Sequence, residues 1–571
     1  MFFFSQLFFF ISLKLIILLL VYNNNILIHY YNMYAQSEVK SARREEVLQA
    51  YNSATATNRR LFLEGDDKAT AEYIFPNQKE DALAIEYEFY YNKRRVISIQ
   101  KKTKVGADGL MIEIAKLLTT HSDDDFVVNP SNVRILTGMS NVSWAKDMID
   151  KAPICFKEKI FHHGQLRRSE LSNIRDGLFI IDEIDTGDKT DMVLHNTLKE
   201  SGIWDVKHMI EHNNRFVFIS ATMIKELYDL YTWGELHELY KMTIPKSYFG
   251  HKDFLDRGLL QEFYSLEIDG NADKWVQQDI IANYGTDYRV HIVRLTNKTV
   301  DLVHNACIRQ GVTFRNHTST DRISLDQFKE FFKETLNTHV VLGVKGFFRR
   351  ANLIPNRWKL RIGATHEYYT VNVDYNVQIQ GLTGRMTGYW REDIERGHKT
   401  GPHRTSIKAV EEYEKTYNDH MGLNTYKTDG FTMKNGVVTK EDTMFSEVNV
   451  GNLEAKELPI VRHKGQNPIV VINITHEEKS KFNKKCIFEL INKYNQEVVS
   501  SYNKYKLHLW NIDNAAKEEK YGLISMLRPN ALSGLTNIRD KDKTKQVLMI
   551  YLYENRLIIS AWNGEEFKET N

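Results

Sequence analysis

Residues Gly177 to Asp185 read GLFIIDEID, and this stretch decides the fold class of the chain. Its apolar run predicts a short buried strand, and two acids, Asp182 and Glu183, follow at once. Open α/β sheets bind their ligands at the carboxyl ends of strands. In a nucleoside triphosphatase the first acid holds Mg²⁺ and the second polarises the attacking water. Taken alone, the stretch could also be a strand that ends in a solvated acidic turn.

Short apolar runs of the same kind recur along the chain and alternate with helical stretches. Such alternation predicts parallel sheets that are covered on both faces by helices. The runs form two series, which we interpret as an α/β protein with lobes at 66–245 and 246–400. The predicted strands are Arg95–Gln100, Val133–Thr137, Gly177–Ile181, Arg215–Ser220, Tyr288–Leu295 and Thr338–Gly343, with helices at Met111–Thr120 and Val300–Gln310.

The remainder, 401–571, reads as a mixed α+β extension whose role the sequence does not indicate. It contains a helical stretch, a β-branched run and two apolar runs separated by three residues, which predict a hairpin. These segments are Glu411–His420, Pro468–Ile474, Gln546–Leu552 and Arg556–Ser560.

Composition excludes some classes of protein but does not identify what this protein binds. The 571 residues include 76 Lys and Arg against 74 Asp and Glu, a net charge of +2, which excludes a histone-like polycation. An enzyme can still bind nucleic acid through one basic groove. The cysteines Cys155, Cys307 and Cys486 have no metal-ligand spacing, so we expect no zinc and a reducing, intracellular compartment.

Residues 1–32 differ from everything after them. Phe2 to Val21 is almost entirely apolar and long enough to span a bilayer, but Lys14 interrupts it. No basic start or small-residue cleavage site supports a signal peptide. Two interpretations stay open: a real membrane anchor, or an over-extended start that precedes Met33. We expect a soluble protein unless the anchor is real.

The strand Arg215–Ser220 runs into Ser220-Ala221-Thr222, about 35 residues after the acidic strand end. DEID followed by SAT resembles motifs II and III of the superfamily 2 helicases, the DEAD/DEAH-like group. The resemblance implies two RecA-like lobes, ATP and Mg²⁺ between them with Asp182 as the metal ligand, and coupling of hydrolysis to lobe movement through Ser220, Ala221 and Thr222.

Two further stretches extend the resemblance. Phe75-Pro76-Asn77-Gln78 is similar to the family's adenine-reading segment, because a glutamine amide can pair with both the donor and the acceptor edge of adenine. Gln378 to Arg385, QIQGLTGR, resembles motif VI and makes Arg385 the arginine finger.

Motif VI departs from the family at two positions. Gly388 stands in place of the usual second arginine, and Gly381 in place of the usual glutamine. We take Arg391 and Gln380 as their candidate replacements, and we therefore include Gln380 among the catalytic residues. An ordinary glycine turn with a basic residue is the alternative.

The phosphate loop departs further. Lys101 to Leu110 reads KKTKVGADGL between a strand and a helix, the setting in which a helix N-terminus binds anions. Against the family's T-G-x-G-K-T, the loop replaces the lysine by Ala107 and the threonine by Asp108. Two interpretations stay open. Lys102 or Lys104 supplies the positive charge that the family's lysine provides, or the loop no longer binds ATP productively. The predicted nucleotide-binding residues of this loop are Lys102, Thr103, Lys104, Gly106, Ala107, Asp108 and Gly109.

Nucleic-acid contacts are less explicit. The family binds the sugar–phosphate backbone of RNA or DNA across both lobes. Thr137 to Ser140 resembles its motif Ia, and Lys345 to Arg350, KGFFRR, lies where motif V is expected. The second stretch contacts phosphate or nucleotide, or is a solvated basic turn. His162 and His163 read as ordinary surface residues.

The sequence thus favours an ATP-dependent helicase or translocase acting on RNA or DNA. The motif VI stretch LTGRMTGY narrows the resemblance to uncharacterised helicases of large DNA viruses, which would place the protein in cytoplasm, nucleus, viral factory or virion. The alternatives are a catalytically inactive helicase-like scaffold that binds nucleic acid or protein and, less favoured, a motor acting on protein.

Overall fold

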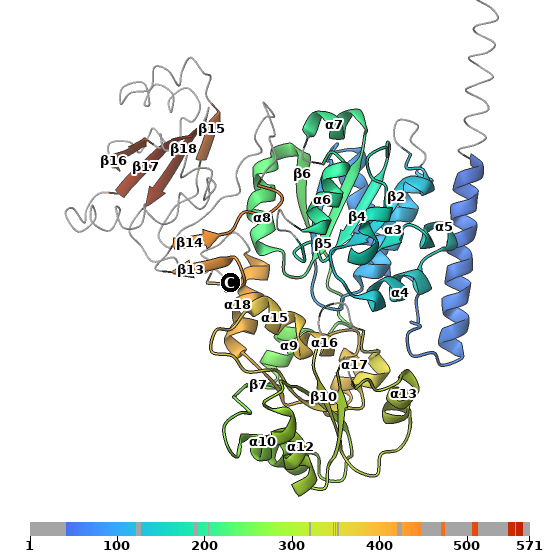
Figure 1. Ribbon diagram of the computed structural model, residues 1–571. Helices are drawn as coiled ribbons and strands as arrows, with labels where there is room; N and C mark the ends of the chain where they lie inside the picture. Colours follow the sequence, from blue (N-terminus) through green and yellow to red (C-terminus); the bar gives the residue numbers. More distant parts are fainter. Residues whose placement is uncertain are drawn as a thin grey trace, which may run out of the picture.

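The fold is known from a computed structural model (Figure 1). It describes residues 41–121, 127–187, 192–203, 205–318, 321–346, 348, 350, 353–419, 425–434, 437–446, 470–473, 505–511, 546–553 and 556–562. No helix in these ranges is long and apolar enough to cross a membrane. The two interpretations of residues 1–32 concern residues outside the described ranges, as does Cys486.

The first sheet has six parallel strands in the order β3-β2-β4-β5-β1-β6. Its central strands β1, β4 and β5 are buried along their whole length, which explains their unbroken apolar sequences. The strands are β1 (Val96–Gln100), β2 (Val133–Thr137), β3 (Ile160–Phe161), β4 (Leu178–Asp182), β5 (Arg215–Ser220) and β6 (His237–Lys241). The helices are α2 (Pro76–Tyr90), α3 (Ala107–Thr120), α4 (Val142–Lys151), α5 (Ile154–Lys157), α6 (Val193–Glu200), α7 (Val206–Glu211) and α8 (Ile224–Leu230).

The second sheet also has six parallel strands, in the order β7-β12-β11-β8-β10-β9. Apolar clusters cover both faces of each sheet. The strands are β7 (Leu260–Glu262), β8 (Val290–Arg294), β9 (Thr313–His317), β10 (Val340–Val344), β11 (Ile362–His366) and β12 (His403–Thr405). The helices are α9 (His251–Asp256), α10 (Asn271–Lys274), a π-helical segment (Trp275–Ile281), α11 (Ala282–Tyr284), α12 (Val300–Arg309), α13 (Leu325–Lys333), α14 (Asn356–Lys359), α15 (Tyr375–Gln380), α16 (Leu382–Met386), α17 (Arg391–Glu395) and α18 (Ile407–Asn418).

The two sheets confirm the predicted α/β class with two RecA-like lobes, stacked one above the other in Figure 1. Both outer limits of the lobes are wrong, however. A helix at 41–63, before the predicted start at 66, buries Val47 in the first lobe's core, and its Tyr51 hydroxyl donates to Glu113 on α3 at 2.6 Å. Strand β12 lies beyond residue 400 but pairs with β11 and β7 inside the second sheet.

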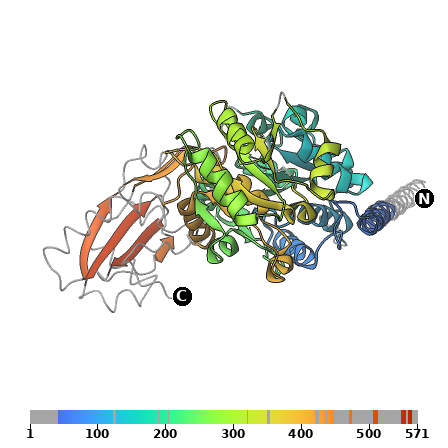
Figure 2. The same ribbon diagram turned by 90° about the horizontal axis from the view of Figure 1, so that it is seen from below.

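The extension begins by returning to the first lobe. A hairpin of β13 (Phe431–Lys434) and β14 (Val437–Lys440) follows α18, and Phe445 then packs in the first lobe's core, where its carbonyl accepts from Trp233 Nε1 at 3.2 Å. A separate four-stranded sheet, order β15-β18-β17-β16, contains the predicted hairpin. Figure 2 shows it on the side of the molecule away from the helix at 41–63. Its strands are β15 (Val470–Asn473), β16 (Tyr505–Asn511), β17 (Gln546–Tyr553) and β18 (Arg556–Trp562).

Candidate functional site

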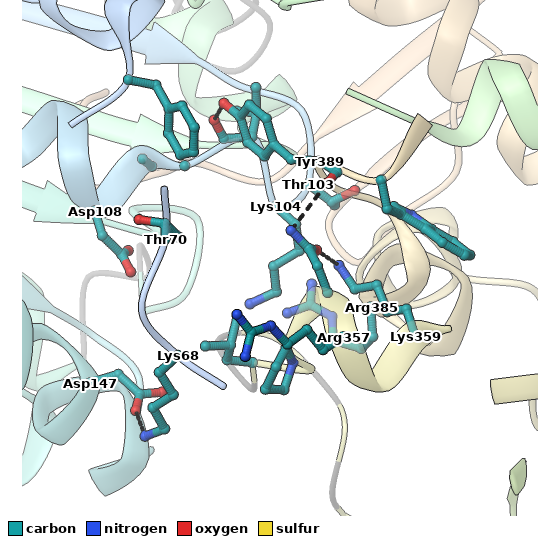
Figure 3. A pocket seen from close by; sticks show the side chains of 18 of the residues that line it. Lys68, Thr70, Thr103, Lys104, Asp108, Asp147, Arg357, Lys359, Arg385 and Tyr389 are labelled. Carbon is teal, nitrogen blue, oxygen red and sulfur yellow. Dashed lines mark hydrogen bonds and ion pairs between the residues drawn. The ribbon is translucent and has the colours of Figure 1, made fainter. Parts of the chain in front are cut away.

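A cavity of about 500 Å³ lies between the two lobes. Its first-lobe side is the loop between β1 and α3 together with the end of β4, and its second-lobe side comes from α14, α16 and the turn before α17. Figure 3 looks into this cavity, with Lys104, Lys359 and Arg385 directed into it from different segments. A cavity of this size is typical of small-molecule sites.

The acidic end of β4 is neutralised by a lysine that the sequence analysis did not single out. Lys101 Nζ lies 3.0 Å from Asp182 Oδ1 and 2.9 Å from Glu183 Oε1. The second oxygen of Asp182 accepts from Trp144 Nε1 at 2.9 Å. Burial opposes the charged form of Lys101, but the two carboxylates outweigh it and raise the pKa of this lysine.

Groups of the second lobe reach the same acids across the cleft. Gln380 Nε2 donates to Glu183 Oε2 at 3.1 Å, and Gln380 Oε1 accepts from Arg385 Nη2 at 3.0 Å. Burial lowers the pKa of Arg385 to about 10, while the charge of Glu183 opposes that shift. The α16 helix that carries Arg385 is fixed at its start, because the Leu382 N–H donates to Glu367 Oε2 at 2.9 Å.

A second cross-cleft contact involves the last acid of DEID. Asp185 accepts hydrogen bonds from Ser220 Oγ at 2.8 Å and Thr222 Oγ1 at 2.7 Å, both of the SAT stretch. Arg350 of the second lobe donates to Asp185 at 2.8 Å and to Thr222 Oγ1 at 3.1 Å. DEID, SAT and the basic turn therefore form one network, in which Ala221 is buried without a polar role.

Lys102, one of the two candidate phosphate-binding lysines, does not line the cavity. Its Nζ lies 2.7 Å from Glu414 on α18 and packs over the rings of Tyr413 and Tyr417, away from the cavity. Because Lys102 directly follows Lys101 at a strand end, the two side chains leave on opposite faces of the chain.

Lys104, by contrast, lines the cavity with Asp108 (Figure 3). Burial and the nearby charge of Arg385 lower the pKa of Lys104 well below its usual range. Asp108, which stands in place of the family's threonine, pairs with Lys151 of α4 at 2.7 Å. Burial raises the pKa of the Asp108 carboxyl, but the charges of Lys151 and Lys104 outweigh this effect and lower the pKa to about 2. The carboxylate that departs from the family pattern is thus offset by a lysine.

Hydroxyl groups from outside the first sheet hold the backbone of the phosphate loop. The Thr103 carbonyl accepts from Tyr248 at 2.6 Å and from Thr387 Oγ1 at 2.8 Å. The Val105 carbonyl accepts from the Tyr389 hydroxyl at 2.6 Å. Tyr389 reaches over the loop in Figure 3. The loop is thereby fixed to the second lobe at both of these carbonyls.

Gln78 lies beside the loop but not in the cavity. Its Oε1 accepts from the Phe75 N–H at 3.0 Å, its Nε2 donates to the Gly106 carbonyl at 2.8 Å, and 2% of the residue is exposed. Gly106 has a φ of 93°, and a Cβ there would lie 2.1 Å from Gln78 Nε2. A Cβ on Gly109 would lie 2.3 Å from Gln78 Oε1. A side chain at either glycine would therefore displace the Gln78 amide. Ala107, between them, is the buried first residue of α3.

Both departures in motif VI lie at crowded positions. A Cβ at Gly381 would lie 2.4 Å from Glu367 Oε2 and 2.8 Å from the Val377 carbonyl oxygen, so a larger residue there requires the neighbouring groups to shift. A Cβ at Gly388 would lie 2.6 Å from Lys359 Nζ. Arg391, the suggested replacement for the second arginine, lines the cavity but pairs with Asp253 at 2.6 Å.

The stretch Thr137 to Ser140 follows the end of β2, at the same sheet edge as Asp182. Gly138 lies against the Thr186 carbonyl, where a Cβ would come within 1.9 Å. This contact joins the motif Ia stretch to the turn after DEID. His162 accepts from the Gly164 N–H at 3.3 Å, and His163 begins a short 3-10 turn, so neither histidine contacts the cavity.

Sequence reasoning missed several residues of the site, three of them inside stretches that it quoted and two outside any motif. Lys101 could have been found, since the first polar residue after an apolar strand points toward the ligand edge. Lys359 and Trp144 lie in stretches with no motif, and Tyr389 ends the quoted stretch LTGRMTGY without a role having been assigned to it. Lys359 and Tyr389 reach the site only through the packing of the two lobes, whereas Trp144 contacts Asp182 within the first lobe. The missed residues are Lys101, Trp144, Asp185, Lys359 and Tyr389.

The residues fit a triphosphate better than an isolated metal ion. Lys101, Lys104, Lys359 and Arg385 surround the cavity next to the first turn of α3, which favours an anion. Within the described residues, no group of three or more His, Cys, Asp or Glu side chains could hold a metal ion. Mg²⁺ would therefore be shared between Asp182 and phosphate oxygens, as this ion usually is.

Comparison with known proteins finds a likeness in structure alone. No family model and no curated protein matches the chain. Solved structures that resemble it include Dbp5 of S. cerevisiae bound to RNA and ADP BeF3, with 12% identity, a TM-score of 0.35 and coverage of 61% of this chain and 91% of that chain. The DEAD-box helicase Mss116 bound to ssRNA and UDP-BeF has 12% identity, a TM-score of 0.36 and coverage of 61% and 73%. At these TM-scores the likeness carries no functional argument.

Proposed function

We propose that this protein is a superfamily 2 motor that hydrolyses ATP between its lobes and couples hydrolysis to movement on RNA or DNA. The observation that carries the proposal is a buried chain of hydrogen bonds across the cleft: Arg385 donates to Gln380 in the second lobe, and Gln380 donates to Glu183 of the first lobe. Burying charges is costly unless they are paired. Charged groups buried at the contact between the two lobes fit a reaction that takes place only when the lobes are together.

In the proposed reaction Glu183 orients and deprotonates the attacking water, and Gln380 holds the carboxylate of Glu183 in position. Arg385 stabilises the charge that develops on the transferred phosphoryl group. Lys101 and Lys104 bind the phosphates in place of the family's loop lysine. Mg²⁺, held by Asp182, would neutralise part of the triphosphate charge. The Asp185, Ser220, Thr222 and Arg350 network connects this chemistry to the relative position of the lobes.

One observation favours the inactive scaffold as a second candidate. Both oxygens of Asp182 already have partners, Lys101 and Trp144, so a metal ion must compete with Lys101. In a scaffold, Lys101 would serve only to neutralise two buried acids. The narrower resemblance to helicases of large DNA viruses, and the choice between RNA and DNA, stay predictions.

The deciding experiment measures ATP binding and hydrolysis by the full chain with Mg²⁺. We expect binding by calorimetry, and turnover that rises when single-stranded RNA or DNA is added. Because backbone phosphates would supply most of the nucleic-acid affinity, that stimulation should weaken steeply as salt rises. Absence of ATP binding with and without either nucleic acid would replace the motor by the scaffold.

Lys359 makes nucleotide binding depend on pH. Burial and the charge of Arg385 lower the pKa of this lysine from 10.5 to about 7, so above pH 7 it is mostly neutral before nucleotide binds. A triphosphate favours the charged form, so binding at pH 8 should take up protons, and affinity should fall by up to about tenfold per pH unit above 7. Calorimetry in two buffers with different ionisation heats measures the uptake. Lys359→Met should reduce it, with the remainder due to Lys104; no uptake in the wild-type protein would contradict the prediction.

A further inference from the structure

A nucleotide base is normally recognised by an aromatic face and by hydrogen-bonding edges close to the phosphate loop. Phe75 and Gln78 are the groups of this kind beside the loop between β1 and α3. In this protein another side chain, Tyr389 of the second lobe, contacts both of them. A base could be recognised by Phe75 and Gln78 only if Tyr389 left an aromatic face and a hydrogen-bonding edge accessible.

Tyr389 covers one face of Phe75. The two ring centroids are 4.8 Å apart and the planes differ by 9°, so the rings are in contact and no base fits between them. The Tyr389 hydroxyl donates to the Val105 carbonyl at 2.6 Å. Burial raises the pKa of Tyr389 to about 12, and hydrogen bonds from the side chains of Asn77 and Gln78 oppose that rise. The phenol thus takes the stacking and hydrogen-bonding positions that a base would use.

Gln78 has no free edge. Its Oε1 accepts from the Phe75 N–H at 3.0 Å, and its Nε2 donates to the Gly106 carbonyl at 2.8 Å. The residue is almost fully buried and does not line the cavity. A base that stacked elsewhere on Phe75 would therefore find the amide already engaged. The prediction that Gln78 reads adenine does not fit this arrangement.

The position of Tyr389 is tied to lobe closure. Gln380, Arg385 and Tyr389 belong to one continuous segment from α15 to the turn before α17. Gly388 fixes that turn through two backbone hydrogen bonds with Phe249, at 2.7 and 3.0 Å. The lobe arrangement that brings Gln380 to Glu183 is therefore the one that places Tyr389 on Phe75. In the closed site the base-recognition groups are occupied by the protein itself.

We propose that the site recognises the triphosphate but not the base, so that ATP, GTP, CTP and UTP are all substrates. This inference rests on the proposed function and widens its substrate class. The cations that line the cavity would bind the phosphates, which all four nucleotides share. The protein side chains that could distinguish the four bases are Phe75 and Gln78, and Tyr389 contacts them.

The test measures kcat/KM of the full chain for the four nucleotides, with Mg²⁺ and a stimulating nucleic acid. We expect values within about tenfold of one another, because a site that hydrogen-bonds one substrate edge discriminates far more strongly. A preference for ATP of about a hundredfold or more overturns the inference and leaves the motor intact. If none of the four is bound or hydrolysed, the proposed function itself fails.

Variants at Tyr389 test the cause. Tyr389→Ala uncovers one face of Phe75, so a preference among the four nucleotides should appear. Tyr389→Phe keeps the stacked ring and should stay unselective. Tyr91→Ala, at an exposed tyrosine of the first lobe, is the control for losing a ring. Unchanged nucleotide ratios in a folded Tyr389→Ala protein would overturn the role of Tyr389.

Discussion

Replacing Glu183 by glutamine should abolish nucleotide turnover while leaving nucleotide binding intact. Glu183 is the one acid of the cleft that contacts Lys101 of the first lobe and Gln380 of the second, and a positioned base contributes about 10²–10⁴ in rate. A glutamine oxygen can still accept from Gln380, so the interlobe contact survives. The measurement is steady-state hydrolysis beside ATP affinity by calorimetry.

The matched control for this variant is Glu211→Gln, which makes the same change at an exposed position on α7. It should hydrolyse nucleotide at the wild-type rate. If Glu183→Gln keeps that rate as well, Glu183 is not the base, and the acidic strand end is structural. If Glu183→Gln loses binding together with turnover, the carboxylate holds the site together and its role is not confined to water activation.

The buried strands were predictable because their sequences have only one good interpretation. VISIQ, LFIID and RFVFIS are unbroken runs that pack on both faces, and the structure confirms each within one residue. Six strands of the two sheets were missed. Strands β3 and β7 have only two and three residues, and β11, IGATH, is buried but contains a single large apolar residue. The other three are β6, β9 and β12. Their sequences, HELYK, TFRNH and HRT, are polar because these strands are partly exposed or very short, and their pairing is decided by neighbours far away in the chain.

The residues of the site were also predictable in part, depending on whether they stand at the ends of predicted strands. Asp182, Glu183, Ser220 and Thr222 stand directly at the ends of predictable strands, so their common edge follows from a parallel sheet. Gln380 was proposed only as a substitute for a missing glutamine, and its contact with Glu183 makes that substitution geometrically reasonable. Contacts that cross the cleft could not be derived from sequence, because they depend on how two lobes pack. Of the two candidate loop lysines, Lys104 lines the cavity and Lys102 does not, because adjacent side chains leave a strand on opposite faces and Lys102 is on the face away from the cavity.

The second large effect is expected at Lys101. If this lysine supplies the charge that the family's loop lysine provides, Lys101→Met should weaken Mg–ATP binding by about 10- to 100-fold, the range for a hydrogen bond to a charged group. Lys102→Met is the matched control, one residue along. It breaks the pair with Glu414 and can lower stability, but it should leave ATP affinity unchanged.

Removing Lys101 also leaves Asp182 and Glu183 as a buried pair of like charges. Loss of one partner of a buried ion pair lowers the free energy of unfolding by about 3–5 kcal/mol. The double variant Lys101→Met with Glu183→Gln removes one of those charges and separates folding from binding. If Lys101 binds phosphate, the double variant should unfold at a higher temperature than Lys101→Met and yet bind ATP as weakly. If Lys101 only neutralises the acids, the double variant should recover wild-type affinity, because Asp182 would then be free to hold Mg²⁺ on the nucleotide. Affinity in the two folded variants therefore decides whether this lysine binds the substrate or only balances charge.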